Sequence, residues 1–158
     1  MSSALTRGLN RHTTQSRGDT VRYMMIMRPT AEAVAASKDV SFDEMLTTMG
    51  RYNDELIAAG AMVSGEGLAP PEDGGFVLDF DSDPPTVTAG AYGDRDALFD
   101  GFWIIEVASR EEAEKWALKC PLGPGVKLEM RRIPTVDEFP QDNEYVQKEK
   151  AWRDEHEK

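Results

Sequence analysis

Short apolar runs alternate with amphipathic segments along this chain. The run 21–27 is apolar except for Arg22, and Pro29 follows it closely, so the pattern predicts a buried strand. Ser41 and Glu44 then have the spacing of a capping box at the start of a helix. Apolar residues recur every three or four positions until Gly60, which predicts a helix with one side in the core. These apolar residues are Phe42, Met45, Leu46, Met49, Tyr52 and Leu56.

A second strand and a hairpin are predicted in the middle of the chain. The strand candidate is 61–67, and it ends before Pro70 and Pro71 because proline cannot continue a central ladder. Residues 76–80 and 86–88 can pair as a hairpin around 81–85, where Asp, Ser and Pro cluster as turn formers.

The next part of the chain repeats the order strand, helix, strand. Residues 102–105 are continuously apolar, which is typical of a strand covered on both faces. Ser109 and Glu112 again have capping-box spacing, and Pro121 ends the helix that they begin. Its predicted inner side consists of Ala113, Trp116 and Ala117. Apolar and charged residues alternate in 126–131, which predicts a half-exposed strand.

This order of elements predicts the fold class. Strand, helix, strand, hairpin, strand, helix, strand is an α+β, ferredoxin-like (split βαβ) arrangement with an inserted hairpin. The first strand of each half is central in such a sheet, which fits the two most apolar runs. Two helices cover only one face of the sheet. We therefore expect a second copy to cover the other face, which makes the protein a homodimer.

Composition and charge narrow the class of protein. The chain has 158 residues, of which 40% are hydrophobic and 30% charged, enough for one domain with a real core. Its net charge of −11 argues against binding to nucleic acid or to an anionic membrane surface. Its apolar runs are far shorter than the roughly 20 residues of a membrane span. The single cysteine, Cys120, excludes an intramolecular disulfide, so we expect a cytoplasmic protein.

The two ends of the chain differ from the predicted domain at 21–136. Residues 1–20 are polar and aperiodic, and we expect a disordered arm or a remnant of an expression vector there. Residues 137–158 form an acidic tail in which Tyr145 and Trp152 lie seven positions apart, so a helix would present both on one side. Docking of this tail on the partner subunit and a solvated, fraying helix both remain open.

Four segments of the chain resemble a known family when they are taken together. They read Tyr-Met-Met at 23–25, Ala-Ala-Gly at 58–60, Gly-Glu-Gly-Leu-Ala-Pro-Pro at 65–71 and Gly-Phe-Trp-Ile-Ile-Glu-Val at 101–107. In this order, across residues 21–133, they resemble the YCII-related, DGPF-domain family. The resemblance implies a dimeric α+β barrel of the ferredoxin-like kind, with a cleft beside the sheet.

The chain also departs from that family at two features. Residues 89–92 read Ala-Gly-Ala-Tyr where the family has Asp-Gly-Pro-Phe, although Asp94 falls where many relatives have an acidic residue. Some relatives carry a His and Asp pair suspected of acid–base work. Here the two histidines are His12 in the arm and His156 in the tail, so no histidine-based mechanism is implied.

Other motifs fail at the positions that define them. Residues 65–67 read Gly-Glu-Gly, but Pro70 stands where a dinucleotide fingerprint needs its third glycine. Residues 79–90 open with the spacing of a calcium loop, but Pro84 replaces the turn glycine, so a solvated acidic hairpin is the better interpretation. Cys120 has no core histidine to activate it and is expected to be a buried apolar residue. The sequence therefore predicts no metal site and no cofactor.

Glu66 is the strongest candidate for chemistry. It ends a strand of small residues before a rigid double proline, where a carboxylate can face a cleft and act as general acid or base. Its structural alternative is to accept hydrogen bonds that fix the turn. Asp94 is the second catalytic candidate, and Tyr92, Tyr23 and Trp103 are candidates for ligand contact. The structural alternative for Asp94 and Tyr92 is to fix the loop, and for Tyr23 and Trp103 it is to pack in the core.

Two functions follow from these candidates. The first is a cleft that binds a small organic molecule, with cofactor-independent lyase or isomerase chemistry that uses a carboxylate. The alternative is a noncatalytic accessory or regulatory module, which would also be dimeric. A polar cleft in which ligand can reach Glu66 favours the first function. Hydrogen bonds that tie Glu66 into the turn, beside a filled cleft, favour the second.

Overall fold

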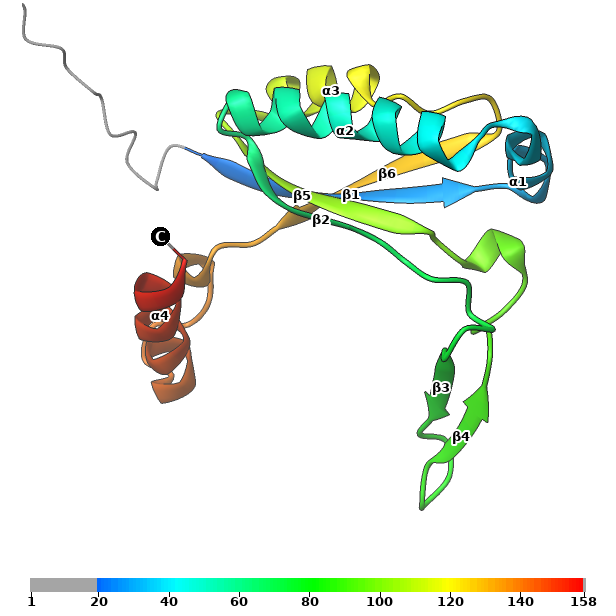
Figure 1. The fold of residues 1–158 in the computed structure, drawn as a ribbon. Coiled ribbons are helices and arrows are strands. Elements are labelled where there is room, and N and C mark those ends of the chain that lie inside the picture. Colours follow the sequence, from blue (N-terminus) through cyan, green and yellow to red (C-terminus); the bar gives the residue numbers. More distant parts are fainter. Residues whose placement is uncertain (1–19, 158) are drawn as a thin grey trace, which may run out of the picture.

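A four-stranded antiparallel sheet with helices on one face forms the body of the protein (Figure 1). The structure is a computed structural model that describes residues 20–157. The strands are ordered β2-β5-β1-β6, with the bounds β1 Val21–Pro29, β2 Met62–Gly67, β5 Gly101–Val107 and β6 Val126–Ile133. The first strands of the two halves, β1 and β5, are central and pair with each other. The α+β class is confirmed, with the strand order of a ferredoxin-like sheet.

The sheet in one copy stays open. Within the described residues the strands close no barrel, so the barrel expected from a second copy remains a prediction. Most of the expected N-terminal arm, residues 1–19, lies outside the described residues. None of the helices in 20–157 combines the length and the apolar character that a membrane crossing requires.

The two covering helices begin at the residues that the sequence indicates. They are α2 (Phe42–Ala58) and α3 (Arg110–Lys119). The Ser41 hydroxyl accepts a hydrogen bond from the backbone N–H of Glu44 at 3.1 Å, and Ser109 does the same for Glu112 at 3.2 Å. These contacts satisfy backbone donors that a first helical turn otherwise leaves unpaired. Gly60, with φ 69, follows the end of α2 in the left-handed conformation that glycine adopts easily.

The core lies between the sheet and these helices. Met25 and Ile105 of the central strands and Leu56 of α2 are fully buried there. The Tyr52 hydroxyl donates to the carbonyl oxygen of Trp116 at 2.8 Å, which ties α2 to α3. Aromatic rings and aliphatic side chains thus hold both helices against one face of the sheet.

The expected core side of α2 is wrong for the first half of the helix. Tyr52 and Leu56 are buried as predicted, but Phe42, Met45 and Leu46 are exposed. Periodicity identifies the apolar side of a helix, but it does not tell how far along the helix the sheet reaches. The apolar side of α2 therefore leaves the core towards its N-terminus.

Several further elements lie around this body. A second, two-stranded sheet is formed by β3 (Phe76–Asp79) and β4 (Thr86–Ala89), as the predicted hairpin. The predicted tail helix is α4 (Glu144–His156). The hairpin and α4 project from opposite ends of the sheet, on the side away from α2 and α3 (Figure 1). The short helices are α1 (Ala31–Ala36), η2 (Ser37–Asp39), η3 (Arg95–Ala97) and η4 (Val136–Glu138).

Candidate functional site

The sheet face away from α2 and α3, termed the open face, is the candidate functional surface. Burial alternates along β5, because Trp103, Ile105 and Val107 are buried under the helices whereas the residues between them are half-buried. In one copy β5 is therefore covered on one face, and the expected covering of its other face by a second copy stays a prediction. Strand register then assigns one apolar and one charged set to the open face. The apolar set is Met24, Ile26, Phe102, Ile104 and Ile133, and the charged set is Arg22, Arg28, Glu66, Glu106, Lys127, Glu129 and Arg131.

Glu66 lies at one end of the open face. It pairs in register with Phe102, which in turn pairs with Ile26 of β1. Its side chain is exposed, and among residues 20–157 it has no hydrogen-bond or ion-pair partner. The backbone around it is fixed, since the N–H of Leu68 donates to the carbonyl oxygen of Asp100 at 2.8 Å. The backbone of Glu66 is thus fixed, whereas its carboxylate makes no contact that ties it into the turn within the described residues.

Glu129, on the same face, is the opposite kind of carboxylate. Arg28 Nε donates to Glu129 Oε2 at 2.8 Å, and Arg131 Nη1 lies 3.3 Å from Oε1. The hydrogen bond from Arg28 is the main reason why the pKa of Glu129 lies below its usual range. A carboxylate that is held ionised by two arginines is a poor proton acceptor, so Glu66 is the better candidate for acid–base chemistry on this face.

Two other predicted site residues lie on the opposite side of the sheet. Tyr23 and Trp103 face the helices and pack against the core. Trp103 is 7% exposed, and its indole Nε1 donates to Asn53 Oδ1 at 2.9 Å. Its ring meets that of Tyr52 edge-on at a centroid distance of 5.9 Å. The sheet itself therefore separates both aromatic residues from Glu66.

The remaining predicted site residues lie in the loop between β4 and β5. Tyr92 and Asp94 are both exposed there, and Asp94 directly precedes η3 without capping it through its side chain. The structure therefore does not gather the five candidate residues into one cluster. Glu66 alone lies on the open face.

A cleft at the other end of the open face was not found from the sequence. It has a volume of about 310 Å³ and lies between the sheet, η4 and α4. Arg22 and Glu106, which pair in register, form its sheet side, and Thr20 donates to Glu106 Oε1 at 2.8 Å. Apolar side chains, among them Ile133 and Phe139, complete the lining. A cleft with both signs of charge and an apolar wall suits a small polar molecule.

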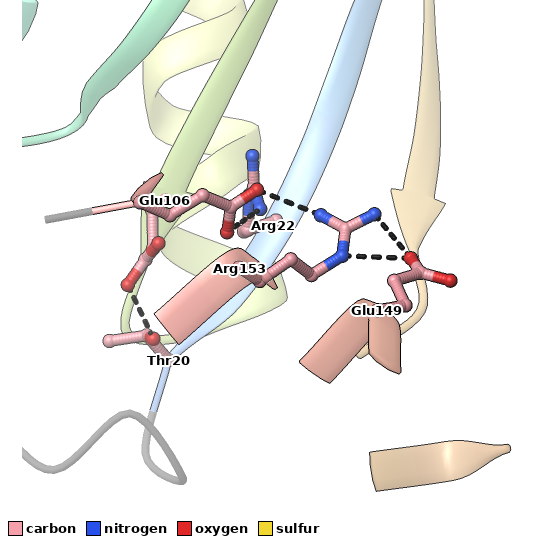
Figure 2. A network of polar contacts seen from close by, with 6 residues as sticks. Thr20, Arg22, Glu106, Glu149 and Arg153 are labelled. Carbon is pink, nitrogen blue, oxygen red and sulfur yellow. Dashed lines mark hydrogen bonds and ion pairs between the residues drawn. The ribbon is translucent and has the colours of Figure 1, made fainter. Parts of the chain in front are cut away.

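The ion pair between Arg22 and Glu157 ties the end of α4 to the sheet, and Arg153 extends this network along the helix (Figure 2). Glu157 lies between two arginines, with Arg22 Nη1 at 3.3 Å and Arg153 Nη1 at 2.8 Å from its carboxylate oxygens. Arg153 also contacts Glu149 at 2.7 Å. Within the described part of the chain, Arg22 Nε is buried and has no hydrogen-bond partner. The sequence holds one signal that could have located this cleft, because Arg22 interrupts an otherwise apolar strand.

The single cysteine is unsuited to nucleophilic chemistry. Cys120 is buried beside Tyr52, and burial raises the pKa of its thiol to about 12. Since the thiolate is the reactive form, this thiol is nearly inert at neutral pH.

One family model matches most of the chain. The model of the YCII-related domain matches residues 21–133, which include the four-stranded sheet, both covering helices and the hairpin. Helix α4 and its side of the cleft lie beyond the matched residues. A search of curated proteins found no match.

Proposed function

The chain belongs to the YCII-related domain family, and we propose that it binds a small organic molecule on the open face of its sheet. The observation that carries this proposal is Glu66, an exposed carboxylate without a side-chain partner among residues 20–157, next to the apolar ring of Phe102. An apolar floor with one uncommitted polar group is the usual composition of a small-molecule site.

The chemistry proposed for Glu66 is proton transfer without a cofactor. In an isomerase, the carboxylate takes a proton from one carbon of the substrate and returns it to another carbon. In a lyase, it takes the proton while the leaving group departs from the neighbouring carbon. Both reactions need a carboxylate within about 3 Å of the proton that moves, in a site that excludes bulk water.

A homodimer would supply that exclusion of water. In one copy α4 lies over only one end of the open face, and elsewhere on it Ile26 is buried whereas Phe102 and Ile104 are only half-buried. A second copy packed on this face would bury them and turn the exposed end of β2 into the wall of a cleft. The proposal is therefore a dimeric site with Glu66 near its edge.

The test is a thermal-shift screen of the purified protein against a panel of metabolites. A ligand of the native state raises the unfolding midpoint by mass action. Glu66→Gln removes the carboxylate charge and keeps the side-chain size, and we expect it to abolish the shift. Glu129→Gln is the matched control on the same face, and Arg22→Gln reports on the cleft between the sheet and α4. A shift lost only in Arg22→Gln would move the site to that cleft.

A noncatalytic accessory module remains the second candidate. The scattered positions of Tyr92, Asp94, Tyr23 and Trp103 favour it, because the structure of one copy does not place them around Glu66. This function predicts that no molecule of the panel shifts the midpoint and that Glu66→Gln is as stable as the native protein. Protein partners would then be the ligands to seek.

A further inference from the structure

The β3–β4 hairpin carries an apolar side that its own chain leaves uncovered. Register places Phe76, Leu78, Val87 and Ala89 on the same side, and Phe80 follows at the next alternate position. Phe76 is 63% exposed and Phe80 is 77% exposed. The hairpin extends away from the body as a separate sheet (Figure 1). A two-stranded hairpin without packing is at best marginally stable, so this apolar side is expected to have a binding partner.

Helix α4 carries a second exposed apolar surface, termed the aromatic stripe. It consists of Tyr145, Lys148, Trp152 and His156, which helical spacing puts along one side. Lys148 Nζ lies 4.7 Å from the ring centroid of Tyr145, and the rings of Trp152 and His156 stack at 4.7 Å. Tyr145 and Trp152 nevertheless remain exposed. On a different side, Glu157 at the C-terminal end of α4 pairs with Arg22 of the sheet and with Arg153 of the helix, which holds the helix near its own sheet.

We infer that the β3–β4 hairpin of one copy packs against the aromatic stripe of α4 in a second copy, and that the hairpin of the second copy packs against α4 of the first. This inference rests on the homodimer of the proposed function. The hairpin and α4 lie at opposite ends of one sheet, so they do not meet within a copy (Figure 1). Both project on the open-face side, and a two-fold rotation that packs two open faces together can exchange the ends. Each hairpin then meets the other copy's α4, and two identical contacts close the dimer.

Charge disfavours a contact between two hairpins. The hairpin end carries Asp79, Asp81 and Asp83, and two hairpins side by side would bring these like charges together. The aromatic stripe carries the imidazole ring of His156 and the ammonium group of Lys148, which also lies 3.5 Å from Glu144 Oε2 of its own helix. Its aromatic rings match the phenyl and aliphatic groups of the hairpin. The apolar side of the hairpin therefore has a partner in the hairpin–α4 contact.

The experiment is a double-mutant cycle on the dimer dissociation constant, measured by sedimentation equilibrium on the full chain. Phe80→Ala and Trp152→Ala are each expected to weaken the dimer by about fivefold or more, because truncated aromatic contacts dominate most interfaces. The double variant is expected to raise the dissociation constant by clearly less than the product of the two single fold-changes, because both residues belong to one contact. Leu118→Ala, at an exposed position of α3, is the matched control and should leave the constant unchanged.

Cross-linking then identifies which surfaces meet. A protein with Phe80→Cys mixed with one carrying Trp152→Cys should give a linked dimer with a short bismaleimide, while Phe80→Cys alone should give none. Cys120 is buried and present in both proteins, so it is a common background. All the substituted residues are exposed, so circular dichroism should show unchanged folding.

Each alternative result overturns the inference in a distinguishable way. Independent effects of the two alanine variants would mean that the hairpin and α4 contact different surfaces. Linked dimers from Phe80→Cys alone would mean that two hairpins meet. A native dimer that neither alanine variant weakens would refute the contact but leave the homodimer of the proposed function intact. A native protein that stays monomeric would refute both.

Discussion

Replacing Trp103 by phenylalanine separates a core role of this residue from a ligand-contact role. The indole is 7% exposed and donates to Asn53 Oδ1 at 2.9 Å, so the structure places it in the core. Trp103→Phe keeps an aromatic ring but removes the N–H donor and part of the buried ring surface. We expect the variant to fold, to bind ligand as the native protein does, and to be less stable.

The loss of stability can be worked out from these contacts. The lost hydrogen bond costs about 1 kcal/mol, because Asn53 is half-buried and water can reach its amide only in part. The lost ring atoms and the space that they leave add about 1–2 kcal/mol. The expected decrease in the free energy of unfolding is therefore about 2–3 kcal/mol. In a domain of this size that lowers the unfolding midpoint by roughly 4–12 °C.

Urea unfolding followed by circular dichroism measures this decrease. Trp152→Phe is the matched control, since it makes the same change at an exposed position of α4 and should shift the free energy by about 0.5 kcal/mol or less. A Trp103→Phe protein as stable as this control would refute the core assignment. Loss of ligand binding at unchanged stability would mean that Trp103 contacts the ligand.

Three further changes test local features of the structure. A Cβ on Gly65 would lie 2.8 Å from Trp103 Cδ1, so Gly65→Ala should lower the free energy of unfolding by about 1–3 kcal/mol in urea; an unchanged value would contradict that packing. Because burial raises the pKa of Cys120 to about 12, iodoacetamide at pH 9 should alkylate the native protein at least about a hundredfold more slowly than the unfolded one, and equal rates would show an accessible thiol. Hydrogen bonds, mainly from Arg132, lower the pKa of Glu138 to about 2. Any stabilisation by this pair is therefore present above 4.5, the ordinary pKa of the group, and is lost as the pH falls towards 2. Arg132→Gln should raise the Glu138 pKa in an NMR titration, and an unmoved titration would contradict the pairing.

Local sequence signals located most of the fold. Ser41 and Gly60 bracket α2 because each satisfies a backbone requirement of a helix end within a few residues. Helix α1 also begins at a capping residue, since the Thr30 hydroxyl accepts a hydrogen bond from the backbone N–H of Ala33 at 3.2 Å. Its six residues are nevertheless too few for a periodic pattern. Its start is also held from far away, by the backbone N–H of Thr30 donating to the Gly125 carbonyl oxygen at 3.1 Å.

The site was harder to predict because it depends on register and on distant pairs. Glu66 pairs with Phe102, so a shift of one residue would put it on the same face as Trp103. An irregularity between Met62 and Ser64 helps to set that register, and composition does not reveal it. The cleft between the sheet and α4 depends on the ion pair of Arg22 with Glu157, near the other end of the chain. Periodicity carries no information about such a contact.

Binding of a molecule found in the metabolite screen, measured by titration calorimetry with the native protein and with Glu66→Gln, tests the central claim most directly. If the ligand lies on the open face against Glu66, the variant should bind it at least about tenfold more weakly, which corresponds to about 1.4 kcal/mol. Glu129→Gln should bind it as the native protein does. Equal affinities for the native protein and Glu66→Gln, or a panel in which no molecule stabilises the native protein, would contradict the account.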